Sequence, residues 1–187
     1  DGAFSFSYPT VLDSWKRAGT ELKYFSPLAD EAPDKDADAI YLPGGYPELH
    51  AGRLSTNQNF FRKLREAASR GVAIYGECGG YMVLGEVLID ANAREHKMAG
   101  LLPLKSSFSK RLLHLGYRRV TTLRRSCLGH QGIEFRGHEF HYASVVSEGP
   151  GASLIKVTDA RGENEQTCGL VKGSVAGSFV HLIDRAP

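Results

Sequence analysis

The fold is decided by residues 72–84, which read VAIYGECGGYMVL from Val72 to Leu84. Residues 72–75 form a short apolar run that is typical of a buried strand. A glycine-flanked turn around Cys78 follows, and residues 81–84 continue as a helix. A tight turn from a buried strand into a helix lifts one side chain above the carboxyl-terminal edge of a sheet. The sequence therefore predicts that Cys78 stands at such an edge.

Cys78 has the surroundings of a catalytic nucleophile. Glycines on either side tolerate unusual backbone angles and avoid Cβ clashes. The amino terminus of the following helix favours the thiolate, which is the reactive form of cysteine, and the backbone N–H of Gly79 can face a developing oxyanion. The alternative is a buried structural cysteine that acts as a small hydrophobe. Cys127 and Cys168 lack this context, and we interpret both as structural or incidental.

Apolar strands alternate with helices on both sides of this turn. We expect strands at residues 3–6, 20–25 and 39–42, helices at residues 10–18 and 57–70, and an acidic loop at residues 30–38. Further strands at residues 117–123, 133–135, 140–146 and 154–158 are joined by turns. This order predicts an α/β fold with three layers, in which a mostly parallel central sheet has helices on both faces. The later strands predict an antiparallel extension in the second half.

The composition fits one globular domain over residues 1–187, with 42% hydrophobic and 24% charged residues. A net charge of +2 is too balanced to indicate a nucleic-acid-binding or membrane-surface protein. Arginines gather only at residues 118, 119, 124 and 125, where a solvated face is favoured over a site for anions. The three cysteines are widely spaced, which argues against a disulfide framework or a zinc site. We therefore expect a reducing compartment, namely the cytoplasm.

A thiol nucleophile needs an imidazole partner, and seven histidines compete for this role. His181 follows a short apolar strand, at the sheet edge where catalytic groups collect, and is slightly favoured over His141. His138 and His141 are three residues apart, so on a strand they point to opposite faces and no metal site is expected. We interpret Glu77, His138, Glu139 and His141 as substrate-facing or structural groups.

Gly44 and Gly45 follow another buried strand. Carboxyl-terminal ends of neighbouring parallel strands lie together, so these N–H groups could supply a second oxyanion donor; a plain turn is the alternative. No phosphate-binding loop of the Gly-x-x-x-x-Gly-Lys-Ser/Thr type occurs in the chain.

Six stretches together resemble a known family. LPGGYPE at residues 42–48, GECGG at residues 76–80 and FVH at residues 179–181 resemble a class I glutamine amidotransferase domain. DGAFSF at residues 1–6, GYPELHA at residues 45–51 and RGHEFHY at residues 136–142 narrow the resemblance. Together they are similar to the C-terminal domain of the cobyrinate (or hydrogenobyrinate) a,c-diamide synthases of the cobalamin pathway. The resemblance extends over nearly the whole chain.

The resemblance implies a reaction in two parts. Cys78 would attack glutamine to form a thioester and release ammonia, with His181 as the base and Gly45 and Gly79 at the oxyanion positions. A separate N-terminal domain would use ATP and Mg²⁺ to activate carboxylates a and c of a corrinoid, which that domain would mainly bind. The resemblance implies no cofactor in the present domain, no nucleic-acid or membrane partner, and a longer polypeptide of which this chain is one piece.

One departure from the class I pattern leaves a gap. That pattern has a Glu two residues after the histidine, where this chain has Ile183. Asp184 cannot be assumed to replace it, so the partner that orients His181 stays open, as does the choice between a cobalt-containing and a metal-free acceptor. Three other functions are considered: a sibling amidotransferase for another tetrapyrrole or cobyric acid, a stand-alone cysteine hydrolase, and a non-catalytic binding domain.

Overall fold

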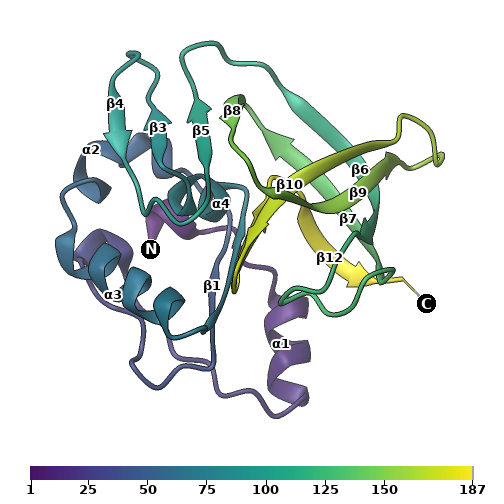
Figure 1. Cartoon of the computed structure of the whole chain (residues 1–187), viewed down its shortest axis with the longest axis horizontal. Helices are drawn as coiled ribbons and strands as arrows, with labels where there is room; N and C mark the ends of the chain where they lie inside the picture. The colour runs from purple at the N-terminus through teal and green to yellow at the C-terminus, as the bar shows by residue number, and fades with distance from the viewer. Residues whose placement is uncertain (187) are drawn as a thin grey trace.

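The computed structural model describes residues 1–186, which form two sheets with helices packed around them (Figure 1). The α-helices are α1 (Pro9–Arg17), α2 (Ala51–Leu54), α3 (Gln58–Ser69) and α4 (Gly79–Leu84). Short 3-10 turns are η1 (Gly2–Phe4), η2 (Pro27–Ala29) and η3 (Pro47–Leu49). The larger sheet has the strand order β1-β2-β11-β10-β9-β6-β7-β12, and the smaller has the order β4-β3-β5-β8.

The strands of the larger sheet are β1 (Ala39–Leu42), β2 (Ala73–Glu77), β6 (His114–Thr122), β7 (Glu134–His141), β9 (Ala152–Asp159), β10 (Gln166–Lys172), β11 (Val175–Ser178) and β12 (His181–Arg185). Those of the smaller sheet are β3 (Val87–Ile89), β4 (Glu95–Lys97), β5 (Leu104–Ser107) and β8 (Ser144–Glu148).

The parallel part of the larger sheet consists of β1, β2 and β11. All other pairs in this sheet are antiparallel, as in β6 with β7 and β9 with β10. The α/β class and the antiparallel extension are confirmed, but the sheet is mixed rather than mostly parallel. Short turns join most strands of the second half, and short turns connect antiparallel neighbours, whereas parallel pairing needs a long crossover.

Helices cover both faces of the parallel strands, as predicted. Ile40 and Leu42 of β1 and Ile74 of β2 belong to the same buried cluster as α3 and α4. Tyr41 points to the opposite face, where its ring meets that of Trp15 on α1 at 5.2 Å between centroids. No residue of α1 is fully buried, and a cavity of about 1080 Å³ lies between this helix and the sheet. The layer formed by α1 is therefore the more loosely packed of the two.

Three predicted strands differ from the observed ones. Residues 20–25 form no strand, and residues 3–6 contribute the turn η1, capped by the Asp1 carboxylate, and one bridge from Phe6 to Gly44. Residues 140–146 are divided between β7 and β8, which belong to different sheets. Apolar alternation in these stretches reports burial of single side chains, and only the pairing of the folded chain decides whether a ladder forms.

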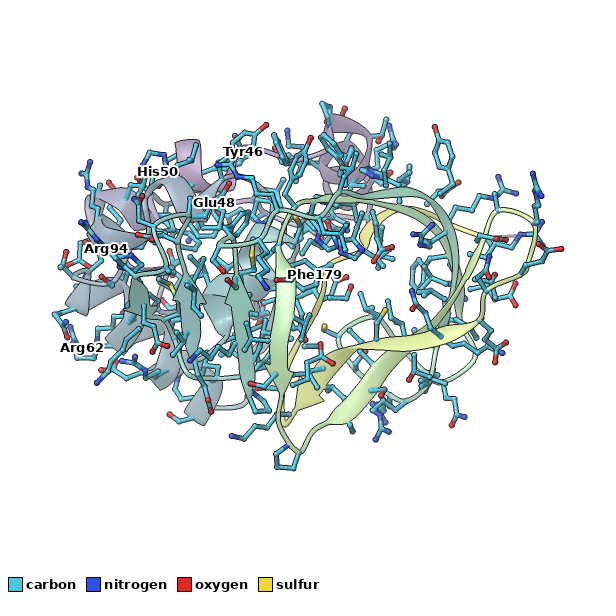
Figure 2. The ribbon with its side chains drawn as sticks, turned by 90° about the horizontal axis from the view of Figure 1, so that it is seen from above. Tyr46, Glu48, His50, Arg62, Arg94 and Phe179 are labelled. Atoms are coloured by element: carbon cyan, nitrogen blue, oxygen red, sulfur yellow. The ribbon has the colours of Figure 1, made fainter. Side chains whose placement is uncertain are left out.

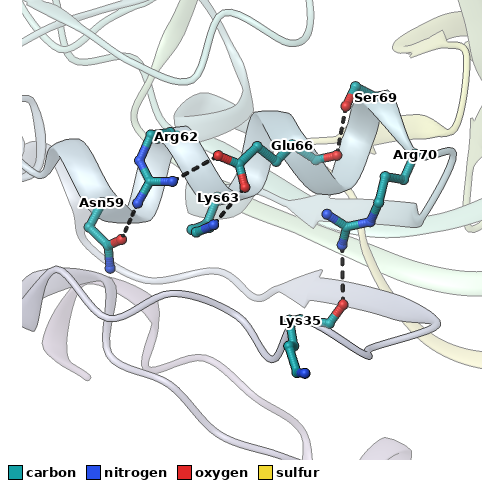
Figure 3. A network of polar contacts seen from close by, with 7 residues as sticks. All are labelled: Lys35, Asn59, Arg62, Lys63, Glu66, Ser69 and Arg70. Carbon is teal, nitrogen blue, oxygen red and sulfur yellow. Dashed lines mark hydrogen bonds and ion pairs between the residues drawn. The ribbon is translucent and has the colours of Figure 1, made fainter.

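The helix α3 shows why the predicted helix at residues 57–70 forms. Phe60, Phe61, Leu64 and Ala67 recur at helical spacing and are buried against the sheet. The outer face carries an ion network in which Glu66 accepts from Arg62 at 2.8 Å and from Lys63 at 2.7 Å (Figure 3). The apolar face thus anchors α3 beside β1 and β2, whose ends build the site.

Close packing between the start of α4 and the end of β1 predicts that a side chain at Gly80 destabilises the fold. A Cβ atom at Gly80 would overlap the Leu42 carbonyl, with its carbon only 2.6 Å away, because α4 crosses directly over the end of β1. We expect Gly80→Ala to lower the free energy of unfolding by about 2 kcal/mol through overpacking, measured by urea denaturation. The control is Gly52→Ala on α2, where the nearest atom is 3.8 Å away. This variant should be unchanged or more stable by up to about 1 kcal/mol. Equal effects of the two substitutions would contradict the proposed close contact.

Candidate active site

The ends of three neighbouring parallel strands define the site. Leu42 of β1 and Gly177 of β11 are both in register with Gly76 of β2. The chain therefore leaves all three strands at the same level of the sheet. Residues 43–45, Cys78 and His181 follow these strand ends directly, so the sheet itself places them together.

Cys78 occupies a turn with a strained backbone. Its φ of 47° and ψ of −101° lie outside the regions that ordinary residues adopt. Two hydrogen bonds hold the turn: the Cys78 N–H donates to the carbonyl of Ser178 at 2.8 Å, and the Gly80 N–H donates to the carbonyl of Pro43 at 3.1 Å. Such a conformation costs about 1–3 kcal/mol and persists where the surroundings impose it. The predicted strand-to-helix turn is confirmed.

His181 lies beside Cys78, with Gly44 between them. A Cβ atom at Gly44 would overlap the His181 ring, lying 3.3 Å from Nε2, and would be 3.4 Å from Cβ of Cys78. The absence of a side chain at Gly44 therefore leaves open the space that borders both the imidazole and the Cys78 side chain. His181 follows a short strand as expected: two residues separate it from the end of β11, and it is itself the first residue of β12.

The predicted oxyanion glycines are neighbours across the same site. The backbone nitrogen of Gly45 is 3.0 Å from the position that a Cβ atom on Gly79 would occupy. A Cβ atom on Gly45 would in turn overlap the carbonyl of Ala3 in η1. Neither position has room for a side chain, and both backbone amides lie next to the Cys78 turn.

Cys78 is not a resting thiolate, which differs from the expectation based on the helix amino terminus. The side chain is 3% exposed, and burial raises its pKa to about 12. The Gly79 N–H near the sulfur acts in the opposite direction but is outweighed, and the carboxylates of Glu48 and Glu77 add to the rise. The thiol must therefore lose its proton to a base when substrate is bound.

His181 is suited to accept that proton because it is neutral at rest. It is 1% exposed, and burial, together with His138 and His141, lowers its pKa to about 4. Its ring stacks on that of His138 with centroids 4.9 Å apart and planes 4° from parallel. Within residues 1–186, neither ring nitrogen of His181 has a hydrogen-bond partner.

The remaining residues of the HEFH stretch take separate positions. His138 is held by the Tyr8 hydroxyl at 2.5 Å, whereas the Nδ1 atom of His141 lies 3.0 Å from the carbonyl of Ala143. Glu139 forms an ion pair with Arg118 at 2.6 Å. Burial alone would raise the pKa of Glu139, but contacts with His141 and Arg118 outweigh it and hold the pKa below its usual value. Arg118 therefore departs from the predicted solvated arginine face, because it is partly buried and paired with Glu139. Arg119 is exposed, as predicted.

Glu77 lies directly behind the nucleophile at the end of β2. It is 3% exposed, and its Oε2 atom lies 3.8 Å from Nδ1 of His181. The Tyr41 hydroxyl donates to Oε2 at 2.8 Å, and the Leu182 N–H donates to Oε1 at 3.1 Å. Burial raises the pKa of Glu77 to about 7, against the effect of these two donors.

Sequence reasoning missed two side chains at the site. Tyr8 comes from the segment before α1, and its ring centroid lies 5.9 Å from that of His181; the spacing of residues along the chain carries no signal for it. Glu48 lies in η3, three residues after Gly45; Tyr46 and His50 flank η3 along the chain (Figure 2). Burial raises the pKa of Glu48, and its Oε2 atom has no hydrogen-bond partner in the described part of the chain. The sequence did contain a signal for Glu48, because it ends the PGGYPE stretch that includes the predicted oxyanion residue Gly45.

This geometry agrees with what the chain resembles among known proteins. The model of the CobB/CobQ-like glutamine amidotransferase domain matches residues 1–186. The chain belongs to this family.

Curated relatives of high sequence identity share one name. Hydrogenobyrinate a,c-diamide synthase from Brucella anthropi is 56% identical over 185 residues, which cover 98% of this chain and 42% of that protein. The protein with the same name from Rhodobacter capsulatus is 52% identical over 183 residues, with the same coverage. The chain thus spans less than half the length of these relatives.

Solved structures support the fold. A glutamine amidotransferase crystal structure matches with a TM-score of 0.61 and 19% identity, covering 90% of this chain and 82% of that one. A glutamine amidotransferase from Thermotoga maritima matches with a TM-score of 0.58 and 16% identity, covering 92% of this chain and 69% of that one.

Within residues 1–186, no cluster of at least three acidic, His or Cys side chains could hold a metal ion, and no helix is long and apolar enough to cross a membrane.

The buried carboxyl of Glu77 predicts a specific pH dependence of stability. Its folded pKa of about 7 exceeds the ordinary value of 4.5, so the folded chain binds this proton more tightly than the unfolded chain. The contribution of Glu77 to stability is therefore complete below the lower value and is lost as the pH rises to the upper one, by about 3 kcal/mol in total. His181 acts in the opposite direction, because its lowered pKa costs stability as the pH falls.

Comparison with Glu77→Gln isolates the carboxyl, because His181, with a pKa of about 4, is neutral over the pH range compared. Between roughly pH 5 and pH 8, wild type should lose about 3 kcal/mol of unfolding free energy relative to Glu77→Gln, measured by urea denaturation at each pH. Parallel stability curves for the two proteins would show that Glu77 has an ordinary pKa.

Proposed function

We propose that this chain is the glutaminase domain of a hydrogenobyrinate or cobyrinate a,c-diamide synthase. The observation that carries the proposal is the pairing of a strained, buried Cys78 with a neutral His181 across the side-chain-free Gly44. Glutamine is the substrate, and ammonia passes to a corrinoid acceptor. The 52–56% identity to synthases of that name supports this acceptor class.

The mechanism follows from the protonation states of the resting site. His181 takes the thiol proton as Sγ of Cys78 attacks the carboxamide carbon of glutamine. The backbone N–H groups of Gly45 and Gly79 stabilise the oxyanion that develops on the carboxamide oxygen. Collapse expels ammonia, which takes its proton from His181, and leaves a glutamyl thioester. Water, activated by His181, then releases glutamate and restores the thiol.

The amidation half of the reaction belongs to the rest of the longer protein. The curated relatives are more than twice as long as this chain, which covers 42% of them. We place ATP, Mg²⁺ and most corrinoid contacts in an N-terminal domain of the same polypeptide. No cofactor is assigned to the present domain.

A nucleophile test separates the two halves. In the full-length enzyme, Cys78→Ala should abolish glutamine-dependent amidation and leave ammonia-dependent amidation unchanged, because ammonia bypasses the thioester. Cys168→Ala is the matched control and should retain both activities. Diazo-oxo-norleucine, a thiol-directed glutamine analogue, should label Cys78, as mass spectrometry of the tryptic peptides would show. Loss of both activities in Cys78→Ala, or labelling of Cys127 instead, would contradict the assignment.

An apolar surface beside the site is where we expect the N-terminal domain. Leu115 and Tyr117 on β6 are 64% and 71% exposed, and Phe140 on β7 is 43% exposed. Leu115 pairs with Phe140, and Tyr117 pairs with His138, whose ring stacks on His181. Exposed apolar side chains gathered on one face mark a contact surface. Here the surface adjoins His181 through His138. The part of the relatives that this chain does not match is the occupant that we propose.

Docking at this surface predicts a loss of coupling when it is disrupted. In the full-length enzyme, Tyr117→Lys should reduce the stimulation of glutamate release by ATP and hydrogenobyrinic acid about tenfold, as a lost interface aromatic does. Tyr24→Lys is the control, because Tyr24 is an equally exposed tyrosine, at 75%, outside this surface; stimulation there should be unchanged. The same response in both variants would exclude the surface as the docking site.

A further inference from the structure

We propose that Glu77 is the positioning residue that orients the imidazole of His181, the role that Ile183 cannot fill. A nucleophilic cysteine needs a base, and the base in turn needs a third group that fixes its tautomer and direction. This inference rests on the proposed glutaminase function and names a further residue for the same reaction.

The first support is the geometry of the imidazole. The Nε2 atom of His181 lies on the side of Gly44, which also borders Cβ of Cys78, and Nδ1 lies on the side of Glu77, 3.8 Å from Oε2. For Nε2 to accept the thiol proton, the neutral ring must carry its own proton on Nδ1. The carboxylate of Glu77 is an acceptor on that side, and catalytic hydrogen bonds of this kind are often long before substrate binds.

The second support is that the carboxylate is itself held in place. The N–H of Leu182 binds Oε1, and the hydroxyl of Tyr41 binds Oε2, so two donors on different strands fix its plane. A carboxylate oxygen accepts more than one hydrogen bond, so Oε2 retains a lone pair for Nδ1 of His181. Because Leu182 directly follows His181 on β12, the same strand positions both the imidazole and the carboxylate.

The third support is the lack of another acceptor. Ile183 has no polar atom, and Asp184 is exposed on the outer part of β12. His138 presents the face of its ring to His181, with planes 4° from parallel, and its Nε2 atom binds the Tyr8 hydroxyl. Among residues 1–186, Glu77 is the acidic side chain within ion-pair distance of His181.

The arrangement assigns a chemical task to the residue that precedes the nucleophile. When His181 takes the thiol proton it becomes an imidazolium, and an ionised Glu77 stabilises that charge in a site closed to water. Cys78 and Glu77 are consecutive residues at the end of β2, so one strand end supplies the nucleophile and, through His181, the group that activates it.

The decisive variant is Glu77→Gln. The Leu182 N–H is a fixed donor, so the amide oxygen of glutamine should face it and the NH₂ group should face His181. That NH₂ would donate to Nδ1 and impose the tautomer whose Nε2 carries the proton and cannot accept one from Cys78. We expect glutamate release by the full-length enzyme, with ATP and hydrogenobyrinic acid, to fall about 100-fold in kcat with little change in KM for glutamine.

Three controls distinguish positioning from a structural role. Asp184→Asn removes a carboxylate from the same strand as His181 and should retain full glutaminase activity. Ammonia-dependent amidation should be retained in Glu77→Gln, because it bypasses the thioester. Glu77→Asp restores a carboxylate with a shorter reach and should recover part of the lost kcat. In wild type the acid limb of kcat/KM should fall near the Glu77 pKa of about 7, and this limb should move in Glu77→Asp.

Each outcome decides the proposal. Activity of Glu77→Gln within about twofold of Asp184→Asn would overturn it. So would an unmoved acid limb in Glu77→Asp, or equal loss of the glutamine- and ammonia-dependent activities. Failure of the glutaminase proposal itself is recognised separately, since Cys78→Ala would then retain glutamate release.

Discussion

The close approach of α4 to the parallel strands is the constraint on which the site depends. Gly80 lies against the Leu42 carbonyl, and Gly76 leaves no room for a Cβ atom beside Gly80. With these glycines only Cys78 separates the end of β2 from the start of α4, so its backbone must turn through a positive φ. The strain is imposed by packing, and its result is that Cys78 lies where three strands end.

Burial then determines how the resting site behaves. Desolvation holds the Cys78 thiol protonated and His181 neutral, and it brings the pKa of Glu77 to about 7. The neutral His181 is ready to accept a proton, but the Cys78 thiol must still lose its proton and Glu77 must be fully ionised for the proposed reaction. Under the proposed function, glutamine and the docked N-terminal domain would bring about these changes, so ammonia would be released only when an acceptor is present. Under the proposed function, such a site would be slow in the isolated domain and would couple ammonia release to the acceptor.

Glu77 destabilises the fold in which we propose that it has a functional role. Its burial costs stability at neutral pH, because an ionised carboxylate is held away from water. Tyr41 and Leu182 offset part of this cost with two hydrogen bonds. A carboxylate whose burial costs folding free energy, and which two hydrogen-bond donors hold in place, is typical of a functional position.

The sequence by itself determined the apolar strands at residues 39–42 and 72–75, the amphipathic α3 and the glycine-flanked turn at Cys78, because each depends on local periodicity or local backbone geometry. It also pointed to His181 and the glycines at positions 45 and 79. It could not decide that residues 20–25 form no strand, that the sheet is mixed, or that Tyr8 and Glu77 adjoin His181. Those features depend on which strands pair and at what register, and pairing joins residues as far apart as Glu77 and Leu182. Only the tertiary structure brings such residues within reach of one imidazole.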